Sequence, residues 1–286
     1  MRDQCNRFGI SEFTTWPWSF ERDVERYAAH GLDTIEVCEF KLNRDDYRPQ
    51  LRSIERSGLT VSSVQSTVHA LFPDSLAPSP SDPEDRIRHM KAAIERIAPH
   101  VPAQVPFVVI TGAAPGGDAR MVYERAVTAF AELATFAAER GVRMAYEPLN
   151  PVLFNTDTAL WGLDQALELV RRVDHPALGI CLDTWNIFQT PNLHEVIREC
   201  GERIFLVQVS DWHQPRSGAD RISLGDGTID NAAIMRACRE AGYAGPFVLE
   251  IFSDESLPDS IWRADIDEVI DRNVAAFVRL WDESVA

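Results

Sequence analysis

The sequence predicts an α/β fold, a single (β/α)8 barrel that occupies residues 1–286 as one domain. Eight apolar runs of strand length alternate with eight amphipathic stretches of helical length. The runs are continuously hydrophobic rather than alternating, which is typical of parallel strands covered by helices. A doubly wound open sheet also alternates strands and helices, but no GxGxxG follows the first run. Four of the later runs also end in oxygen-bearing side chains. Four such side chains on consecutive strands suit a closed ring better than an open sheet.

The predicted strands are short, mostly apolar and bounded by turn-forming residues. They cover residues 7–13, 33–40, 59–66, 106–111, 142–147, 177–183, 204–210 and 247–252. Strands that alternate with helical patterns in this way indicate repeated strand–helix units and a parallel sheet.

The predicted helices lie between these strands and carry apolar stripes at helical spacing. They cover residues 19–29, 44–57, 84–99, 119–140, 157–173, 193–200, 231–241 and 259–282. In the third, we expect Asp82 to cap the helix and Pro83 to take its first position. We expect the fifth to begin behind a Thr156 cap. Residues 67–83 contain four prolines and predict a long loop at the mouth of the barrel rather than a domain boundary.

The composition argues against several classes of protein. The net charge of 28 − 44 = −16 disfavours a nucleic acid or an anionic membrane as partner. The first residues contain no apolar signal core, and no run reaches the length of a membrane helix. The five cysteines form no CxxC motif, so free thiols in a reducing compartment are expected. We therefore expect a soluble, cytoplasmic protein that binds a small molecule, and a homo-oligomer is left open.

Four oxygen-bearing side chains close four successive predicted strands. They are Glu147, Asp183, Gln208 and Glu250, separated by 36, 25 and 42 residues. In a closed parallel barrel these side chains converge at the C-terminal mouth, where such barrels keep their chemistry. Three carboxylates and an amide oxygen would repel one another there without a cation. The set predicts one divalent metal, manganese first, with magnesium, cobalt or zinc as alternatives. A structural role, with arginines or backbone donors satisfying the glutamates, is the other interpretation.

The residues around these positions resemble a known family. The chain reads YEPLNP at Glu147, CLDTWN at Asp183, VQVSDW at Gln208 and LEIFSD at Glu250. In this order, the motifs are similar to the metal ligands of the xylose-isomerase-like TIM-barrel superfamily, and the similarity is densest from 143 to 255. That superfamily includes sugar isomerases, ketose 3-epimerases, inosose isomerases and dehydratases, 3-dehydroshikimate dehydratases and the family 2 apurinic endonucleases. The resemblance implies a metal-dependent enzyme with a carbohydrate or cyclitol substrate.

The resemblance also implies separate roles for the four side chains. In the family's isomerases and epimerases, the metal holds the carbonyl and hydroxyl oxygens of the substrate, and two metal-bound glutamates move the proton. Glu147 and Glu250 would take these catalytic roles, whereas Asp183 and Gln208 would be ligands only. Metal polarisation stabilises an enediolate that a carboxylate base could not otherwise form near neutral pH.

Two residues depart from the epimerase pattern. Gln208 stands where many members have His, and Gln is seen instead in hydroxypyruvate-isomerase-like and dehydroshikimate-dehydratase-like members. Asn186 stands where epimerases and dehydratases commonly place a substrate-binding His. It could still hydrogen-bond a substrate hydroxyl, but neither side chain can act as an acid or base.

Two further candidates for substrate binding carry basic groups. Arg221 matches the family's arginine ahead of a PGxG turn, with Leu224 in place of the proline, and could grip a hydroxyl or carboxylate. Its alternative is a salt bridge to Asp220 or Asp226. His69 follows the third predicted strand and is expected on the rim, where it could bind substrate or make a structural hydrogen bond.

Acidic and aromatic residues at predicted strand ends complete the candidate site. Glu39 could contact substrate hydroxyls at the mouth or pair with Lys41 or Arg44. Trp185 could form a wall for the apolar face of a sugar or cap the core of the barrel. The same alternatives hold for three other tryptophans that follow strands: Trp16, Trp18 and Trp212.

The implied chemistry leaves two activities open. The first is a metal-dependent isomerase or epimerase of a keto-sugar or keto-polyol that acts through an enediolate. The alternative is a metal-dependent lyase, such as a dehydratase of a cyclic keto-acid, which Gln208 favours and Asn186 disfavours. A DNA repair endonuclease would need further His and carboxylate ligands and a basic groove, which the sequence does not offer. The intact set of four ligands disfavours a non-catalytic subunit.

Overall fold

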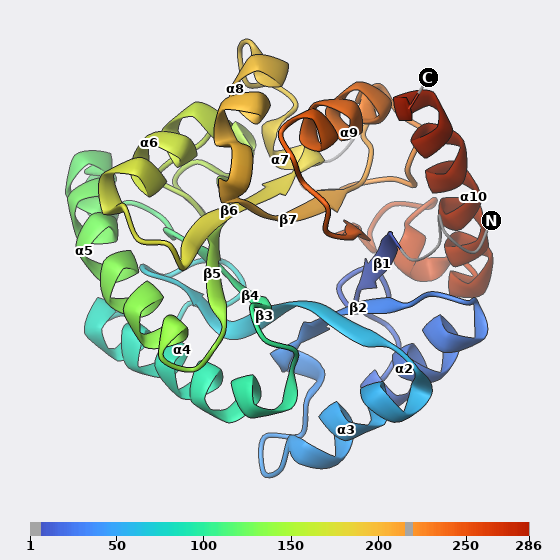
Figure 1. Cartoon of the computed structure of the whole chain (residues 1–286), viewed down its shortest axis with the longest axis horizontal. Helices are drawn as coiled ribbons and strands as arrows, with labels where there is room; N and C mark the ends of the chain where they lie inside the picture. Colours follow the sequence, from blue (N-terminus) through green and yellow to red (C-terminus); the bar gives the residue numbers. More distant parts are fainter. Residues whose placement is uncertain (1–6, 215–219, 286) are drawn as a thin grey trace.

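The predicted (β/α)8 barrel is confirmed by the computed structural model of the chain, which describes residues 7–214 and 220–285. Over these residues, eight parallel strands pair in sequence order, and β1 pairs with β8 to close the ring (Figure 1). The strands are β1 (Phe8–Ser11), β2 (Thr34–Cys38), β3 (Thr60–Ala70), β4 (Pro106–Ile110), β5 (Arg143–Tyr146), β6 (Leu178–Asp183), β7 (Ile204–Val209) and β8 (Phe247–Leu249).

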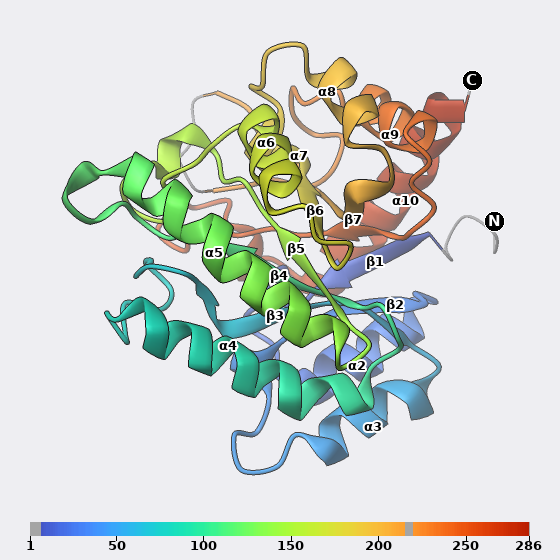
Figure 2. The same cartoon turned by 60° about the vertical axis from the view of Figure 1, so that its left-hand side comes forward.

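Helices surround the ring, and Figure 2 shows two of them, α4 and α5, side by side on its outer face. The helices are α2 (Phe20–Ala29), α3 (Arg48–Ser57), α4 (Pro83–Ile97), α5 (Ala119–Ala138), α6 (Leu163–Val173), α7 (Thr184–Ile187), α8 (Leu193–Cys200), α9 (Asn231–Glu240) and α10 (Ile266–Val285). Short 3-10 turns, among them η1 (Glu39–Lys41), η4 (Pro151–Leu153) and η6 (Ile261–Arg263), lie in the connections. Within the described residues, no helix has both the length and the apolar composition that a membrane crossing requires.

The start of α4 follows the sequence prediction. The side chain of Asp82 accepts hydrogen bonds from the backbone of Glu84 at 2.8 Å and of Asp85 at 3.2 Å. Pro83 takes the first helical position, where its missing N–H leaves no hydrogen bond unmade. The predicted cap of this helix is therefore confirmed.

The start of α6 differs from the prediction. The helix begins at Leu163 rather than at 157, and the hydroxyl of Thr156 donates to the carbonyl of Leu153 at 3.0 Å instead of capping it. Gly162 precedes the helix with φ of 84°, a conformation that glycine adopts without strain and that ends the helical path. Residues 154–162 consequently form a longer loop at the mouth of the barrel. Helices α3 and α10 also begin later than predicted.

The inner face of the barrel changes from apolar to polar along its strands. A buried apolar cluster contains Val108, Ala145, Cys181, Leu206 and Val248, one residue from each of β4 to β8. Alternate residues of a strand share a face, so the inner residue that follows lies two positions further on. For β5 to β8 these positions are Glu147, Asp183, Gln208 and Glu250. The strand period alone therefore directs the four predicted ligands to one end of the interior.

Candidate active site

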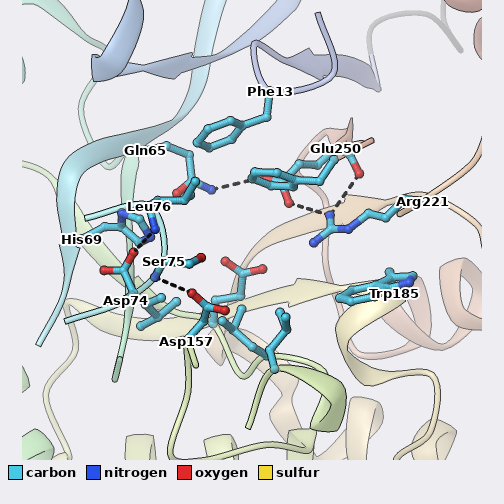
Figure 3. A pocket seen from close by; sticks show the side chains of 15 residues that line it. Phe13, Gln65, His69, Asp74, Ser75, Leu76, Asp157, Trp185, Arg221 and Glu250 are labelled. Atoms are coloured by element: carbon cyan, nitrogen blue, oxygen red, sulfur yellow. Dashed lines mark hydrogen bonds and ion pairs between the residues drawn. The ribbon is translucent and has the colours of Figure 1, made fainter. Parts of the chain in front are cut away.

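Three buried carboxylates meet at the C-terminal end of the ring. Glu147 follows β5, Asp183 ends β6 and Glu250 follows β8. One oxygen of each side chain lies within 4.8 Å of the other two. Glu147 and Glu250 also line a cavity that opens at this end of the barrel, and Figure 3 shows Glu250 in it beside Arg221 and Gln65. The structure thus brings together the three predicted carboxylate ligands.

Arg221 places a positive charge within this cluster. Its Nη1 lies 2.7 Å from Asp183 Oδ2 and 2.8 Å from Glu250 Oε2. The guanidinium carbon lies 4.8 Å from the ring centre of Trp185, so the side chain is held between carboxylates and an aromatic face. Asp226, one of the alternative partners, pairs with Arg272 instead. Arg221 and Trp185 both line the cavity, as substrate-binding residues would.

Asn186 lies behind the carboxylates rather than in the cavity lining. Its Nδ2 donates to Glu147 Oε1 at 2.7 Å and to Asp183 Oδ2 at 3.2 Å, and its Oδ1 accepts from the backbone N of Asn150 at 2.9 Å. Both ends of the amide are therefore occupied within the protein. In this arrangement Asn186 orients two of the acids, which differs from the direct substrate contact that the sequence predicts.

Gln208 joins the cluster through its nitrogen. Nε2 donates to Glu250 Oε1 at 2.9 Å and to both oxygens of Glu36 at 3.0 and 3.1 Å. Its Oε1 accepts instead from the thiol of Cys181 at 3.0 Å. The amide oxygen expected to bind a metal thus faces away from Glu250, and the amide would have to turn over to serve as a ligand.

Glu36 is a buried acid of this site that was not among the predicted site residues. It belongs to β2, and Ser63 on β3 donates to its Oε2 at 2.6 Å. The signal that could have found it is the alternation of TIEVC, in which apolar Ile35 and Val37 pack outside the ring and Glu36 faces the interior. The run 33–40 was interpreted as continuously apolar, and this alternation was overlooked.

Glu39 does not join the other predicted site residues. It begins η1, beyond the end of β2, and its carboxylate accepts from Tyr47 Oη at 2.7 Å and from the backbone N of Thr67 at 2.7 Å. Arg96 of α4 pairs with it at 2.9 Å. These residues line a separate cavity outside the one that holds the carboxylates. Glu39 therefore lies away from the cavity in which a substrate contact was predicted. Its partners are Tyr47, Thr67 and Arg96 rather than the predicted Lys41 or Arg44.

The long loop that follows β3 forms part of the cavity wall, as predicted. His69, near the end of β3, lines the cavity and donates from Nδ1 to the carbonyl of Ser66 at 3.1 Å. Ser75 and Leu76 line it from the loop. Asp157 lines it from the loop before α6. It was not among the predicted site residues because its segment was predicted to be helical. Trp16, Trp18 and Trp212 are not among the residues that line this cavity.

The comparisons with known proteins agree with the barrel fold. A family model described as xylose isomerase-like TIM barrel matches residues 24–272. The chain belongs to that family. It is 34% identical over 136 residues to a 3-dehydroshikimate dehydratase of Pseudomonas putida, covering 43% of this chain and 20% of that protein. It is 25% identical over 174 residues to an L-ribulose 3-epimerase of a Methylomonas species, covering 60% of this chain and 54% of that one.

The chain thus spans about a fifth of the length of that dehydratase and about half of that epimerase.

Two solved structures share the fold of this xylose isomerase-like barrel. A protein from Sinorhizobium meliloti matches with a TM-score of 0.84 and 24% identity, over 96% of this chain and 98% of that one. The IOLI protein with a bound zinc atom matches with a TM-score of 0.77 and 18% identity, over 97% and 99% of the two chains.

Three buried glutamates of this xylose isomerase-like barrel have raised pKa values. Burial raises the pKa of Glu147 well above its ordinary value, and the neighbouring Asp183 carboxylate raises it further. Burial also raises the pKa of Glu250, although the Arg221 guanidinium opposes the change. The pKa of Glu36 is raised by burial as well, against hydrogen bonds that favour its ionised form.

We expect the metal-free protein to lose stability as the pH rises. An unfolded glutamate releases its proton near 4.5, whereas folded Glu36, Glu147 and Glu250 keep theirs to higher pH. At these three sites the unfolded chain binds fewer protons in this window, so their contribution to the free energy of unfolding falls as the pH passes from about 4.5 through the raised pKa values. His69, whose pKa burial lowers, contributes in the opposite direction, and the three glutamates are expected to outweigh it. Urea denaturation in chelator between about pH 5 and about pH 8 measures it.

The same titration with saturating manganese is the control. A bound cation favours the ionised carboxylates, so the dependence of stability on pH should flatten or reverse. Stability that stays constant or rises with pH in the metal-free protein would contradict the expectation. Surface acids whose pKa is lowered, such as Asp46, are already ionised at the lower end of this pH range. They therefore add no change in stability that could hide the effect.

Proposed function

We propose that this protein is a divalent-metal-dependent isomerase or epimerase that acts on a small keto-sugar or keto-polyol through an enediolate intermediate, with residues 1–286 as one catalytic domain. The observation that carries the proposal is the meeting of Glu147 and Glu250 at one buried cavity. They follow β5 and β8, which lie three strands apart around the ring. Two carboxylates that approach one space from different strands suit a reaction in which one removes a proton and the other returns it.

The charge and the donor atoms of the cluster support a divalent cation. If Glu147, Asp183 and Glu250 were all ionised, they and the Arg221 guanidinium would sum to −3 + 1 = −2 in a buried cluster, with Glu36 as a further buried acid beside it. Oxygen donors suit manganese, magnesium and cobalt, whereas zinc more often recruits His or Cys. Glu147, Asp183 and Glu250 would hold the ion, with Gln208 as a fourth ligand if its amide turned over. When bound, the ion would polarise the carbonyl of the substrate and ease proton removal beside it.

Of the two glutamates, Glu147 is better placed than Glu250 to act as the base. Its Oε1 accepts from Asn186, while no described residue donates to its Oε2. A bound cation would favour its ionised form, which is the form that removes a proton. Glu250 accepts from Gln208, Gln65 and Arg221, so it is held in place to return the proton. Arg221 also lines the cavity and could donate to a substrate oxygen there.

A metal-dependent lyase is the second candidate function. It is supported by the similarity to 3-dehydroshikimate dehydratases. The sequence identity to the Pseudomonas putida dehydratase is 34%, compared with 25% to the L-ribulose 3-epimerase. The same carboxylates could remove the proton, and a hydroxyl on the next carbon would then leave. No arginine besides Arg221 lines the described part of the cavity to bind the carboxylate of a cyclic keto-acid. For this reason we place the isomerase or epimerase first.

One screen separates the two functions. The metal-reconstituted protein is incubated in deuterium oxide with ketohexoses, inososes and 3-dehydroshikimate. Deuterium incorporation is followed by NMR, and elimination is followed by product absorbance. Deuterium exchange without loss of water supports the isomerase or epimerase, whereas loss of water supports the lyase. If a protein with bound metal gave neither result with any of these compounds, the proposed function would be wrong.

We expect one divalent metal ion per chain, bound at the carboxylate cluster. Elemental analysis after dialysis against manganese should give about one equivalent, and Asp183→Asn should lose most of it because a buried carboxylate ligand is removed. Glu39→Gln is the matched control, since that acid is buried in a different cavity and should leave the metal content unchanged. A metal content that Asp183→Asn leaves at the level of the unaltered protein would contradict the assignment.

A further inference from the structure

The cavity has a second polar end apart from the carboxylate cluster. Figure 3 shows Arg221, Trp185 and Glu250 on one side, and His69, Asp74 and Asp157 on the other. Most of the remaining lining is apolar and comprises Phe13, Leu76, Ile110, Leu149, Leu153 and Phe252. A substrate whose reacting carbons lie at the cluster would therefore extend another part of its length towards His69 and Asp157.

Asp157 presents one free oxygen at this second end. Its Oδ1 accepts from the backbone N of Ser75 at 2.7 Å, a bond that joins the loop before α6 to the loop after β3 and fixes the carboxylate. Its Oδ2 receives no hydrogen bond from any residue that the structure describes, although the residue is only 8% exposed. The cavity is thus the side from which a partner for this oxygen could come.

His69 adds a second acceptor. It is 6% exposed, and its Nδ1 lies 3.1 Å from the carbonyl oxygen of Ser66. A carbonyl can only accept, so Nδ1 carries the proton and Nε2 of the neutral ring has a lone pair to offer. Burial lowers the pKa of His69, which favours this neutral ring. No hydrogen bond to Nε2 comes from the described part of the chain.

Asp74 is already committed within the protein. Its Oδ2 pairs with the buried Arg86 at 2.8 Å, and its Oδ1 accepts from the backbone of Leu76 and Ala77. Arg86 does not line the cavity. Over the described lining, the second end therefore offers a carboxylate oxygen and an imidazole nitrogen as acceptors, with no arginine or lysine beside them.

We propose that Asp157, assisted by His69, determines substrate specificity at this end: it accepts a hydrogen bond from a substrate hydroxyl and excludes substrates that carry a phosphate or carboxylate there. A hydroxyl has one proton to donate to either acceptor, whereas a phosphate dianion or a carboxylate has none and is repelled by Asp157. The inference rests on the proposed function for the reacting end but depends on different residues. It narrows the substrate class to compounds that are neutral at their distal end.

Binding of unreactive probes tests the inference without any turnover. Calorimetric titration of the metal-loaded protein uses hexitols (glucitol, mannitol and galactitol) and their terminal phosphate esters, which have no carbonyl to react. The unaltered protein should bind the best hexitol at least about tenfold more tightly than its phosphate ester, because like charges in a buried site repel. Inorganic phosphate is titrated alongside to measure binding of a phosphate group at the metal alone.

Asp157→Asn is the deciding variant. Its amide oxygen can keep the hydrogen bond from Ser75, so that a donor NH₂ replaces Oδ2 in the cavity. The ratio of hexitol to ester affinity should fall by at least about tenfold, while inorganic phosphate binds both proteins equally. Asp164→Asn, an exposed change of the same charge on α6, is the control and should behave as the unaltered protein. His69→Gln, which also adds a donor, is the second variant if Asp157→Asn does not fold.

Three outcomes would overturn the inference: no hexitol bound by the unaltered protein, equal affinity for hexitol and ester, or an affinity ratio that neither variant changes. Selective binding of hexitols by a protein that transforms no keto-sugar would contradict the proposed function and support the specificity inference. The two proposals therefore fail separately.

Discussion

Glu147→Gln and Glu250→Gln should each lower turnover by roughly 10²–10⁴-fold while the protein remains folded. Each change keeps the shape of the side chain and removes the carboxylate that carries the proton. Glu147→Gln preserves a carbonyl oxygen for the hydrogen bond from Asn186, and Glu250→Gln preserves one for Gln208. The measurement is the rate of deuterium exchange into the keto-sugar that the unaltered protein transforms.

The assay must separate a lost proton carrier from a lost metal ligand. Both variants are therefore measured at saturating manganese, with bound metal determined in the same samples. Glu12→Gln is the matched control, since Glu12 is a fully buried acid outside the cavity, whose Oε2 accepts from the backbone N of Cys38. It should keep normal turnover. A Glu147 or Glu250 variant that bound metal and turned over at the normal rate would limit that residue to metal binding.

The sequence was sufficient for the fold and for the convergence of the acids. Parallel strands in a closed ring direct alternate residues inward, so the residue at the end of each apolar run has a defined position. This reasoning placed Glu147, Asp183 and Glu250 correctly. It could also place Gln208 in the same layer, because the strand period fixes the direction of a side chain, although not which end of an amide faces the acids.

The residues beyond the strand ends could not be placed by the same rule. Glu39 was expected at the mouth because the run 33–40 was assigned to one strand, whereas β2 ends at Cys38 and η1 turns its side chain towards Tyr47 and Arg96. Asp157 was missed for the reverse reason, since a helical stripe was extended through Gly162 into a loop. Loop side chains depend on long-range hydrogen bonds, such as that of Asp157 with Ser75, which no local pattern encodes.

Arg221→Met should destabilise the metal-free protein by about 3–5 kcal/mol near neutral pH, because it leaves buried charges without their partner. Arg221 lies 2.7 Å from Asp183 Oδ2 and 2.8 Å from Glu250 Oε2, and all three side chains are buried. Methionine retains most of the packing against Trp185 and Phe252 but none of the charge. Urea denaturation in chelator at about pH 8 measures the loss in the free energy of unfolding.

Arg272→Met is the matched control, because Arg272 pairs with Asp226 at the surface and its loss should cost at most about 1 kcal/mol. Two conditions should rescue Arg221→Met selectively. Lowering the pH towards about 5 favours the protonated form of Glu250, whose pKa burial raises, and adding manganese supplies positive charge in place of the arginine. If Arg221→Met were as stable as the unaltered protein without metal at about pH 8, the buried acids would not be ionised there. The negative charge that supports a divalent cation would then be absent from the free protein and would arise only as the metal displaces protons on binding.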